Sequence, residues 1–262
     1  MNLELANKLA LVSGSTAGIG FAIAQLLLQE GARVIVNGRT QAGVDAALGE
    51  LSAHGSAAIG FAGDLSQAEN AAALAREHPD VEILVNNLGI YETRRFEDIS
   101  DADWQRFFDV NVLSGVRLAR LFLAGMRRRN WGRIVFISSE SAVHIPAEMV
   151  HYGMTKTAQL AVARGLAESV AGTGITVNSI LPGPTRSRGV GELIARAAEA
   201  SQRSVEEVEK DFIQRARPTS LIKRLASPGE VATLVAYIVS PLASATTGAA
   251  LRVDGGTVKS AF

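Results

Sequence analysis

Several features that would identify other classes of protein are missing from this chain. It contains no cysteine, which excludes disulfide bonds and thiolate metal sites, and its four histidines show no zinc-binding spacing. Lysine plus arginine and aspartate plus glutamate number 26 each, so no broad basic field attracts nucleic acid or an anionic membrane. The apolar runs are far shorter than the ~20 residues of a membrane span, and no basic segment leads into a signal core. We therefore expect a soluble cytoplasmic protein without a metal site.

The pattern along the chain is typical of one α/β domain. Its 262 residues are 47% hydrophobic with a positive mean hydropathy, and no linker, repeat or low-complexity tract interrupts them. β-like runs alternate with helical stretches, which predicts a parallel sheet covered by helices on both faces. The expected strands lie near residues 8–13, 33–37, 57–62, 81–86, 133–138, 175–181 and 249–253. Capping boxes or acidic first turns are expected to start helices at Ser66, Ser100, Ser204 and Ser227.

An apolar strand followed by a glycine-rich turn marks the first candidate site. Residues 8–13 read as a buried strand, Gly14, Gly18 and Gly20 follow in a GxxxGxG spacing, and residues 21–30 read as a helix. Glycines let the backbone approach a ligand closely, and a helix start offers unpaired N–H groups and a positive dipole end to a pyrophosphate. This order predicts a dinucleotide site, although a glycine-rich turn is also an ordinary tight connection.

The second candidate site is formed by Ser139, Tyr152 and Lys156. Residues 151–170 read as a helix, so the Lys156 ammonium is expected beside the Tyr152 phenol and is expected to lower its pKa toward the neutral range. Ser139 follows the strand at 133–138, at the edge where open parallel sheets place their sites. The three side chains predict carbonyl–alcohol redox chemistry. A helix-surface Tyr–Lys pair and an ordinary serine turn are the alternative interpretation.

Taken together, these motifs resemble the short-chain dehydrogenase/reductase family in its single-domain form, over nearly the whole chain. The resemblance also rests on Asp64, Asn86-Asn87-Leu88-Gly89, Asn111, Pro182-Gly183 and Val253-Asp254-Gly255-Gly256. Leu88 departs from the family pattern, which usually has alanine there. The resemblance implies a Rossmann-type, doubly wound, three-layer α/β fold with seven parallel strands, and a single domain over residues 1–262.

The resemblance further implies a catalytic set of Ser139, Tyr152, Lys156 and Asn111. Tyr152 is expected to donate a proton to the carbonyl oxygen as hydride reaches the carbon, and Ser139 to orient that oxygen. Lys156 is expected to hold the nicotinamide ribose. Asn111 corresponds to the family asparagine that supports a water between the lysine and solvent.

A cofactor-binding set is implied in the same way. It comprises Gly14, Ser15, Gly18, Ile19, Gly20, Arg39, Thr40, Asp64, Leu65, Asn87, Gly89, Tyr152, Lys156, Pro182, Gly183 and Thr185. In the family, the residue corresponding to Asp64 meets the adenine amino group, and those corresponding to Asn87 and Gly89 line the ribose side. Pro182 and its neighbours are expected to border the nicotinamide carboxamide.

The end of the second strand indicates which cofactor is used. An enzyme that selects NAD normally places an acidic side chain there, which accepts hydrogen bonds from the ribose 2′-OH and repels a 2′-phosphate. This chain has Gly38, Arg39 and Thr40 instead. Arginine at this place is typical of family members that use NADP, so we expect NADP, with Arg39 clamping the phosphate and Thr40 assisting. NAD, with Arg39 as a solvated surface residue, is the alternative.

The substrate side of the site is less defined by sequence. Residues 185–218 form a long insertion with helix-like stretches at 191–200 and 205–217, which predicts a lid over the pocket. A helical hairpin used only in subunit packing is the alternative. Glu140, His144, Met149 and His151 flank the expected catalytic hydroxyls and are candidates to face the substrate in a mostly apolar pocket. A place in the pocket wall or on the protein surface is the alternative that we favour for each of them.

The function expected from these observations is NADP(H)-dependent interconversion of a ketone, of medium size or a 3-oxoacyl compound, and a secondary alcohol. The alternatives are an NAD-linked alcohol or sugar dehydrogenase and a nucleotide-binding scaffold without catalysis. The family resemblance also implies a homotetramer. Residues 102–126 and 155–170 carry more apolar faces than a sheet alone would cover, which fits helices paired between subunits.

Overall fold

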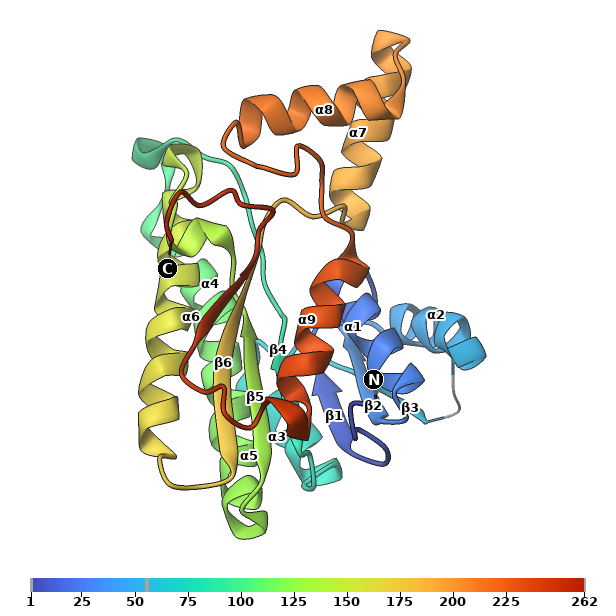
Figure 1. Ribbon diagram of the computed structural model, residues 1–262, viewed down its shortest axis with the longest axis vertical. Helices are drawn as coiled ribbons and strands as arrows, with labels where there is room; N and C mark the ends of the chain where they lie inside the picture. The colour runs from blue at the N-terminus through green and yellow to red at the C-terminus, as the bar shows by residue number, and fades with distance from the viewer. Residues whose placement is uncertain (1, 55–56, 262) are drawn as a thin grey trace.

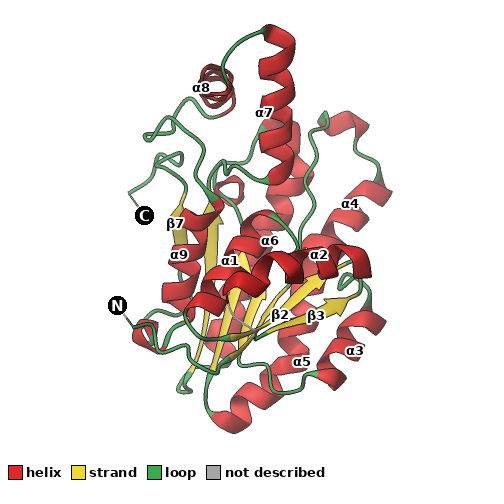
Figure 2. Ribbon diagram, turned by 90° about the vertical axis from the view of Figure 1, so that its right-hand side faces the viewer, coloured by secondary structure: helices red, strands yellow, loops and turns green. Residues whose placement is uncertain are grey.

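The computed structural model describes residues 2–54 and 57–261, which form one parallel sheet between two layers of helices (Figures 1 and 2). The strand order is β3-β2-β1-β4-β5-β6-β7, and every neighbouring pair is parallel. The strands are β1 Leu9–Val12, β2 Arg33–Gly38, β3 Ala58–Ala62, β4 Ile83–Asn86, β5 Gly132–Ile137, β6 Ile175–Pro182 and β7 Ala250–Val253. The predicted doubly wound α/β fold is therefore confirmed, and the strand ends differ from the expected ones by at most two residues.

Two hydrophobic cores hold the helices to the sheet. The helices are α1 Gly18–Gln29, α2 Gln41–Leu51, α3 Ala68–Glu77, α4 Asp101–Phe108, α5 Ser114–Arg129, α6 Val150–Ser169, α7 Arg188–Ser201, α8 Val205–Ala216 and α9 Pro228–Val239. Leu27 of α1 and Val235 of α9 belong to the core on one face, which also receives residues of α2. Leu74 of α3 and Phe122 of α5 belong to the core on the other face, together with residues of α6. Because both faces are buried, the strands are apolar almost throughout.

The first residues of the helices show which capping signals in the sequence correctly predicted where a helix begins. Complete capping boxes begin α4, α8 and α9, with Ser100, Ser204 and Ser227 as the capping residues, as expected. At Ser66 the expectation of a capping box was wrong, because α3 begins at Ala68 and its N-cap, Gln67, makes no side-chain capping bond. The Ser66 N–H instead donates to Asp64 Oδ1 at 2.9 Å, in a turn before the helix.

The helical segment around Asn111 is interrupted. α4 and α5 are joined by a π turn, η3, at Asp109–Leu113, in which the Ser114 N–H bonds the Asp109 carbonyl. A π turn adds one residue to the helical circuit, so it changes the direction in which the residues within it face. Asn111 lies inside this turn and is buried.

The carboxyl ends of the parallel strands meet at one edge of the sheet, and the remaining helices stand above that edge. α7 and α8, drawn in orange in Figure 1, pack around a small core of Ile194, Ile213 and Leu225. This pair corresponds to the helix-like stretches expected in the insertion, with α7 starting three residues earlier, at Arg188.

Candidate active site

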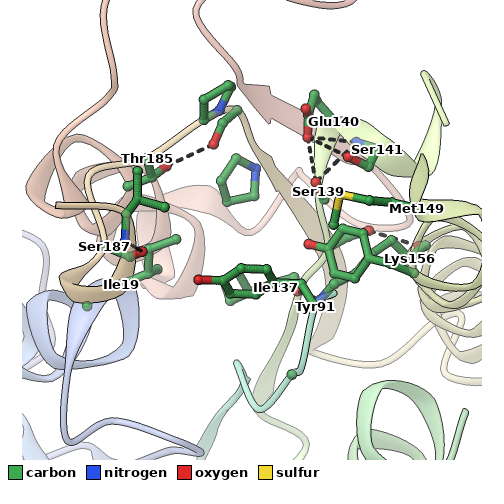
Figure 3. Close-up of a pocket in the computed structure, with 18 of the residues that line it drawn as sticks. Ile19, Tyr91, Ile137, Ser139, Glu140, Ser141, Met149, Lys156, Thr185 and Ser187 are labelled. Atoms are coloured by element: carbon green, nitrogen blue, oxygen red, sulfur yellow. Dashed lines mark hydrogen bonds between the residues drawn. The ribbon is translucent and has the colours of Figure 1, made fainter. Parts of the chain in front are cut away.

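A cavity of about 1000 Å³ opens at the carboxyl edge of the sheet. Its walls come from the glycine loop, the loops after β4, β5 and β6, helix α6 and the α7–α8 pair. In Figure 3, Ser139, Glu140, Met149 and Lys156 lie on one side, and Ile19, Thr185 and Ser187 lie across from them. The predicted residues that line this cavity are Gly18, Ile19, Gly20, Asn87, Gly89, Ser139, Tyr152, Lys156, Pro182, Gly183 and Thr185.

Other predicted residues lie outside the cavity wall. Ser15 is fully buried, and its hydroxyl donates to the Val12 carbonyl at 2.7 Å and accepts from the Asn37 N–H at 2.9 Å. Leu65 is fully buried in the core that holds α3 and α5. The side chains of Ser15 and Leu65 are therefore occupied with protein contacts, and the Ser15 N–H also donates to the Asn37 carbonyl at 2.8 Å.

The residues predicted to meet the adenosine end lie around the ends of β2 and β3. Arg39 is exposed directly after β2. Thr40 caps α2, since its hydroxyl oxygen accepts from the Gly43 N–H at 3.2 Å. Asp64 is half-buried after β3, where one carboxylate oxygen accepts from Ser66.

The start of α1 fits a phosphate-bearing ligand. Gly14 and Gly18 adopt positive φ angles of 62° and 59°, which favour glycine. A Cβ at Gly20 would lie 2.5 Å from the Gly14 carbonyl oxygen, so the tight turn leaves no room for a side chain there. The N-cap, Ala17, makes no side-chain capping bond, and the first turn of α1 holds no acidic residue. The positive end of this helix therefore opens into the cavity, as a pyrophosphate requires.

Two asparagines hold the glycine loop in shape. Asn37, at 1% exposure, accepts from the Gly14 N–H at 3.1 Å and donates to the Phe61 and Gly63 carbonyls. The Asn87 amide donates to the carbonyls of Ser13 and Gly14, each at 3.0 Å. Sequence reasoning missed Asn37. The sequence feature that could have indicated Asn37 is a polar residue near the end of an otherwise apolar strand.

Ser139 and Tyr152 face the same part of the cavity. The Ser139 hydroxyl donates to Glu140 Oε2 at 2.5 Å and accepts from the Ser141 N–H at 3.1 Å. Burial raises the pKa of Tyr152 above its ordinary value of about 10, although a hydrogen bond with Ser139 acts in the opposite direction. Tyr152 is therefore held in its protonated form at neutral pH.

Lys156 is buried beside Tyr152, with Nζ 5.6 Å from the centroid of the phenol ring. Its ammonium donates to the Ile137 carbonyl at 2.9 Å, and burial lowers the pKa of Lys156 to about 7. The expectation that Lys156 lowers the pKa of Tyr152 was therefore wrong for this structure. Burial of the phenol raises its pKa. Burial also lowers the pKa of Lys156, so the lysine is less often charged and does not offset this rise.

Asn111 joins the loop after β4 to helix α6. Its side chain accepts from the Ile90 N–H at 2.8 Å and donates to the Ile90 carbonyl and to Thr155 Oγ1, each at 3.0 Å. A Cβ at Gly89, in the same loop, would lie 3.4 Å from Lys156 Nζ. Asn111 therefore fixes a loop whose glycine leaves space for the lysine.

The four candidate substrate-facing residues divide evenly. Glu140 and Met149 line the cavity. His144 is exposed outside it, and His151 is fully buried with its ring centroid 4.1 Å from that of Phe107. His144 is therefore a surface residue, the alternative expected for it, whereas His151 lies in the core between α6 and α4. His151 precedes Tyr152 on α6 and so points about 100° away from it, toward α4.

A buried ion pair links the serine to the α7–α8 segment. Arg217, at the end of α8, donates from Nε to Glu140 Oε1 at 2.6 Å, and the two side chains are 13% and 4% exposed. The other Glu140 oxygen holds Ser139 and Ser141. Arg217 and Glu140 are 77 positions apart, so no local signal in the sequence indicates this pair.

Comparison with known proteins gives consistent matches over the full length. A family model described as enoyl-(acyl carrier protein) reductase matches residues 14–258. The uncharacterized oxidoreductase YvaG of Bacillus subtilis (strain 168) is 47% identical over 264 residues, which cover 100% of both chains.

Two solved structures are similar in fold and sequence. L-sorbose reductase of Gluconobacter frateurii, complexed with NADPH and L-sorbose, has a TM-score of 0.93 and 29% identity, with 99% of this chain and 100% of that chain covered. A variant of actinorhodin polyketide ketoreductase with NADPH has a TM-score of 0.86 and 31% identity, with 97% and 98% covered. Within residues 2–54 and 57–261, no helix is both long and apolar enough to cross a membrane.

The Glu140–Arg217 pair makes a testable contribution to stability. Glu140→Gln or Arg217→Met alone should each cost about 2 kcal/mol or more, because one buried charge is left without its partner. The double variant should be more stable than the sum of the two losses predicts, by about 1 kcal/mol or more in denaturant unfolding. The same cycle on the exposed pair Arg164–Glu168 serves as the control and should show almost no coupling. Additive losses at Glu140 and Arg217 would show that the pair contributes no stability.

Proposed function

Because this chain belongs to the short-chain dehydrogenase/reductase family, whose members act on CH–OH groups with NAD(P), we propose that it reduces a ketone to a secondary alcohol with NADPH. The observation that carries the proposal is the convergence of Ser139, Tyr152 and Lys156 with the open start of α1 in one cavity. A phosphate-binding helix start and a proton donor beside it are the two parts that such a reaction needs.

The residues around the cavity suit the successive parts of a nicotinamide dinucleotide, from its pyrophosphate to its carboxamide. The start of α1 at Gly18 and Gly20 would hold the pyrophosphate, Lys156 the ribose hydroxyls, and Pro182 and Thr185 would border the carboxamide. NADPH, when bound, supplies the hydride that the substrate carbon receives.

Tyr152 acts as the acid in this proposal. Because burial raises its pKa, the phenol carries its proton at neutral pH and can give it to the carbonyl oxygen. The oxidative direction would need the phenolate, which burial disfavours. A phenol that carries its proton at neutral pH is suited to the reductive step, and the NAD-linked alcohol or sugar dehydrogenase is kept as the alternative.

Ser139 orients the same oxygen. Its hydroxyl has one proton, which in this structure is donated to Glu140. To donate to the substrate, the hydroxyl rotates away from Glu140 Oε2, which keeps its bonds from the Ser141 N–H and hydroxyl. The carboxylate thus remains satisfied while Ser139 polarises the carbonyl.

The cavity wall supports a substrate with an apolar body. Met149, Val190, Phe212 and Leu225 line it, and Tyr91, which is 61% exposed, also contributes to its wall. We propose a medium-sized ketone or a 3-oxoacyl compound as the substrate class. The solved polyketide ketoreductase supports this class, and the L-sorbose reductase supports a sugar as the alternative.

Residues 185–218 are proposed to act as the lid of this cavity within a single domain over residues 1–262. Thr185, Val190, Phe212 and Arg217 all contribute to its wall. The segment has its own small core around Ile194 and is tied to the rest of the site through Glu140. A lid of this kind excludes water from the reacting groups.

NADP is the proposed cofactor because of the shape at the end of β2. A Cβ at Gly38 would lie 2.5 Å from the Thr16 methyl group, so the acidic residue that NAD selection uses would fit only if the Thr16 side chain moved. Arg39 is exposed next to it and would pair with a 2′-phosphate, with Thr40 assisting.

Arg39→Ala tests the cofactor preference. Wild-type protein should bind NADPH at least tenfold more tightly than NADH in calorimetric titration, a difference of ~1.4 kcal/mol or more, and the variant should lose that gap. Arg33→Ala, at the exposed start of β2, is the control and should keep it. Equal affinities in the wild type would instead favour NAD and the oxidative reaction.

Tyr152→Phe tests the catalytic role. NADPH affinity should stay within about twofold, while carbonyl reduction should fall by roughly 100-fold or more, because only the proton donor is removed. Tyr237→Phe, on the surface of α9, is the matched control and should retain turnover. The assay uses medium-sized ketones, 3-oxoacyl thioesters and sugars, and turnover of sugars alone would overturn the substrate class. Unchanged cellular function in the Phe variant would favour a nucleotide-binding scaffold.

The assembly is proposed to be a cytoplasmic homotetramer. Leu121 on α5, Tyr237 on α9 and Leu242 are 40–44% exposed, which leaves apolar surface for contacts between copies. Light scattering should give the mass of four 27.6 kDa chains. A mass of one chain would contradict the proposal.

A further inference from the structure

Gln159 is a buried polar side chain that neither the sequence motifs nor the family resemblance singled out. It lies on α6 three residues after Lys156, and the two residues are 1% and 4% exposed. Residues three apart on a helix share a face. The spacing could therefore have drawn attention to Gln159, although it does not say which way its amide points.

The surroundings of Gln159 determine the orientation of its amide. Nε2 donates to the Asn111 main-chain carbonyl at 2.6 Å, and Oε1 accepts from Lys156 Nζ at 3.3 Å. The reversed amide would place its oxygen against the carbonyl oxygen and its NH₂ group against the ammonium. Both contacts would be repulsive, so only one orientation satisfies the network.

The partner of Gln159 is itself held rigidly. Asn111 lies in the π turn between α4 and α5, and its side chain is bound to Ile90 and Thr155. The carbonyl of Asn111 is therefore a fixed acceptor at the end of a chain that runs from Lys156 through Gln159 to the π turn.

These hydrogen bonds from Lys156 through Gln159 to Asn111 limit the directions in which the Lys156 ammonium can donate. An ammonium has three N–H groups, and the Ile137 carbonyl and Gln159 Oε1 accept two of them within the described residues. Lys156 lines the cavity, so the third N–H is left for a group bound there.

We propose that Gln159 is a positioning residue, which holds the Lys156 ammonium in its charged form and directs its remaining N–H into the cavity. The inference rests on the proposed function, in which Lys156 binds the cofactor ribose. Burial is the only cause of the lowered pKa of Lys156 among the described residues. The other titratable groups that act at this site, Tyr91, Glu140 and Arg217, act on Tyr152.

Two substitutions should move the pKa of Lys156 in opposite directions. Gln159→Met keeps the length of the side chain but removes the acceptor, so the pKa of Lys156 should fall. Gln159→Glu places an anion beside the ammonium, so it should rise. Shifts of ~0.5 or more in each direction are expected in NMR titration of ¹⁵N-labelled lysine, with assignment from Lys156→Arg. Gln105→Met, on the exposed face of α4, is the control and should leave the pKa unchanged.

NADPH affinity provides the functional readout. In Gln159→Met the NADPH affinity should fall at a lower pH than in the wild type, because the ammonium loses its proton at a lower pH, so the ratio of the two affinities should change with pH. A merely structural role would weaken binding equally at every pH. An unchanged pKa of Lys156 in both variants would overturn the inference.

Two features keep the test separate from folding and from the proposed function. The lysine titration needs no turnover, so a wild-type protein that reduces no carbonyl compound would disprove the proposed function and leave this inference open to its own result. If neither variant folds, the inference is tested by hydrogen exchange of the Gln159 side-chain amide in the wild-type protein. The Gln159 side-chain amide protons should exchange slowly because they are buried and bonded to Asn111, and rapid exchange would contradict the inference.

Discussion

The common direction of all seven strands is the constraint on which the site depends. Because β1, β4, β5 and β6 end at the same edge, the glycine loop, the Asn87 loop, Ser139 and the Pro182 loop meet there although they are distant in sequence. The cores on the two faces fix the helices, and α1 and α6 thereby direct a helix dipole and the candidate side chains Tyr152 and Lys156 toward one cavity. Reversing any one of these strands would move its loop to the opposite end of the sheet.

Much of this arrangement could be predicted from the sequence, because its causes are local. Buried parallel strands need continuous apolar runs, so the seven strands were placed within two residues. Three of the four expected serine caps form complete capping boxes for the same reason, since a cap involves only the next three residues. The glycine loop and the Tyr152–Lys156 pair are likewise set by spacing along a single turn or helix.

The remaining features depend on contacts that no local pattern contains. The pKa of Tyr152 is governed by burial, which the fold as a whole decides, so a spacing of four residues gave the wrong direction. The π turn adds one residue to a helix whose apolar pattern continues through it, and Asn111 consequently faces α6. Glu140 meets Arg217 only because the fold brings the end of α8 to the cavity wall. His151 lies in the core because a residue next to Tyr152 on the helix faces another direction.

The contact between Gly38 and the Thr16 methyl group has a consequence for how this protein could evolve. Any side chain at position 38 meets that methyl at 2.5 Å and a Val44 methyl at 3.3 Å. An acidic residue there requires the Thr16 side chain to move, and a change of Thr16 to serine would remove the methyl group that it meets. Positions 38 and 16 are therefore coupled: an acidic residue at position 38 should be tolerated better together with serine at position 16 than alone.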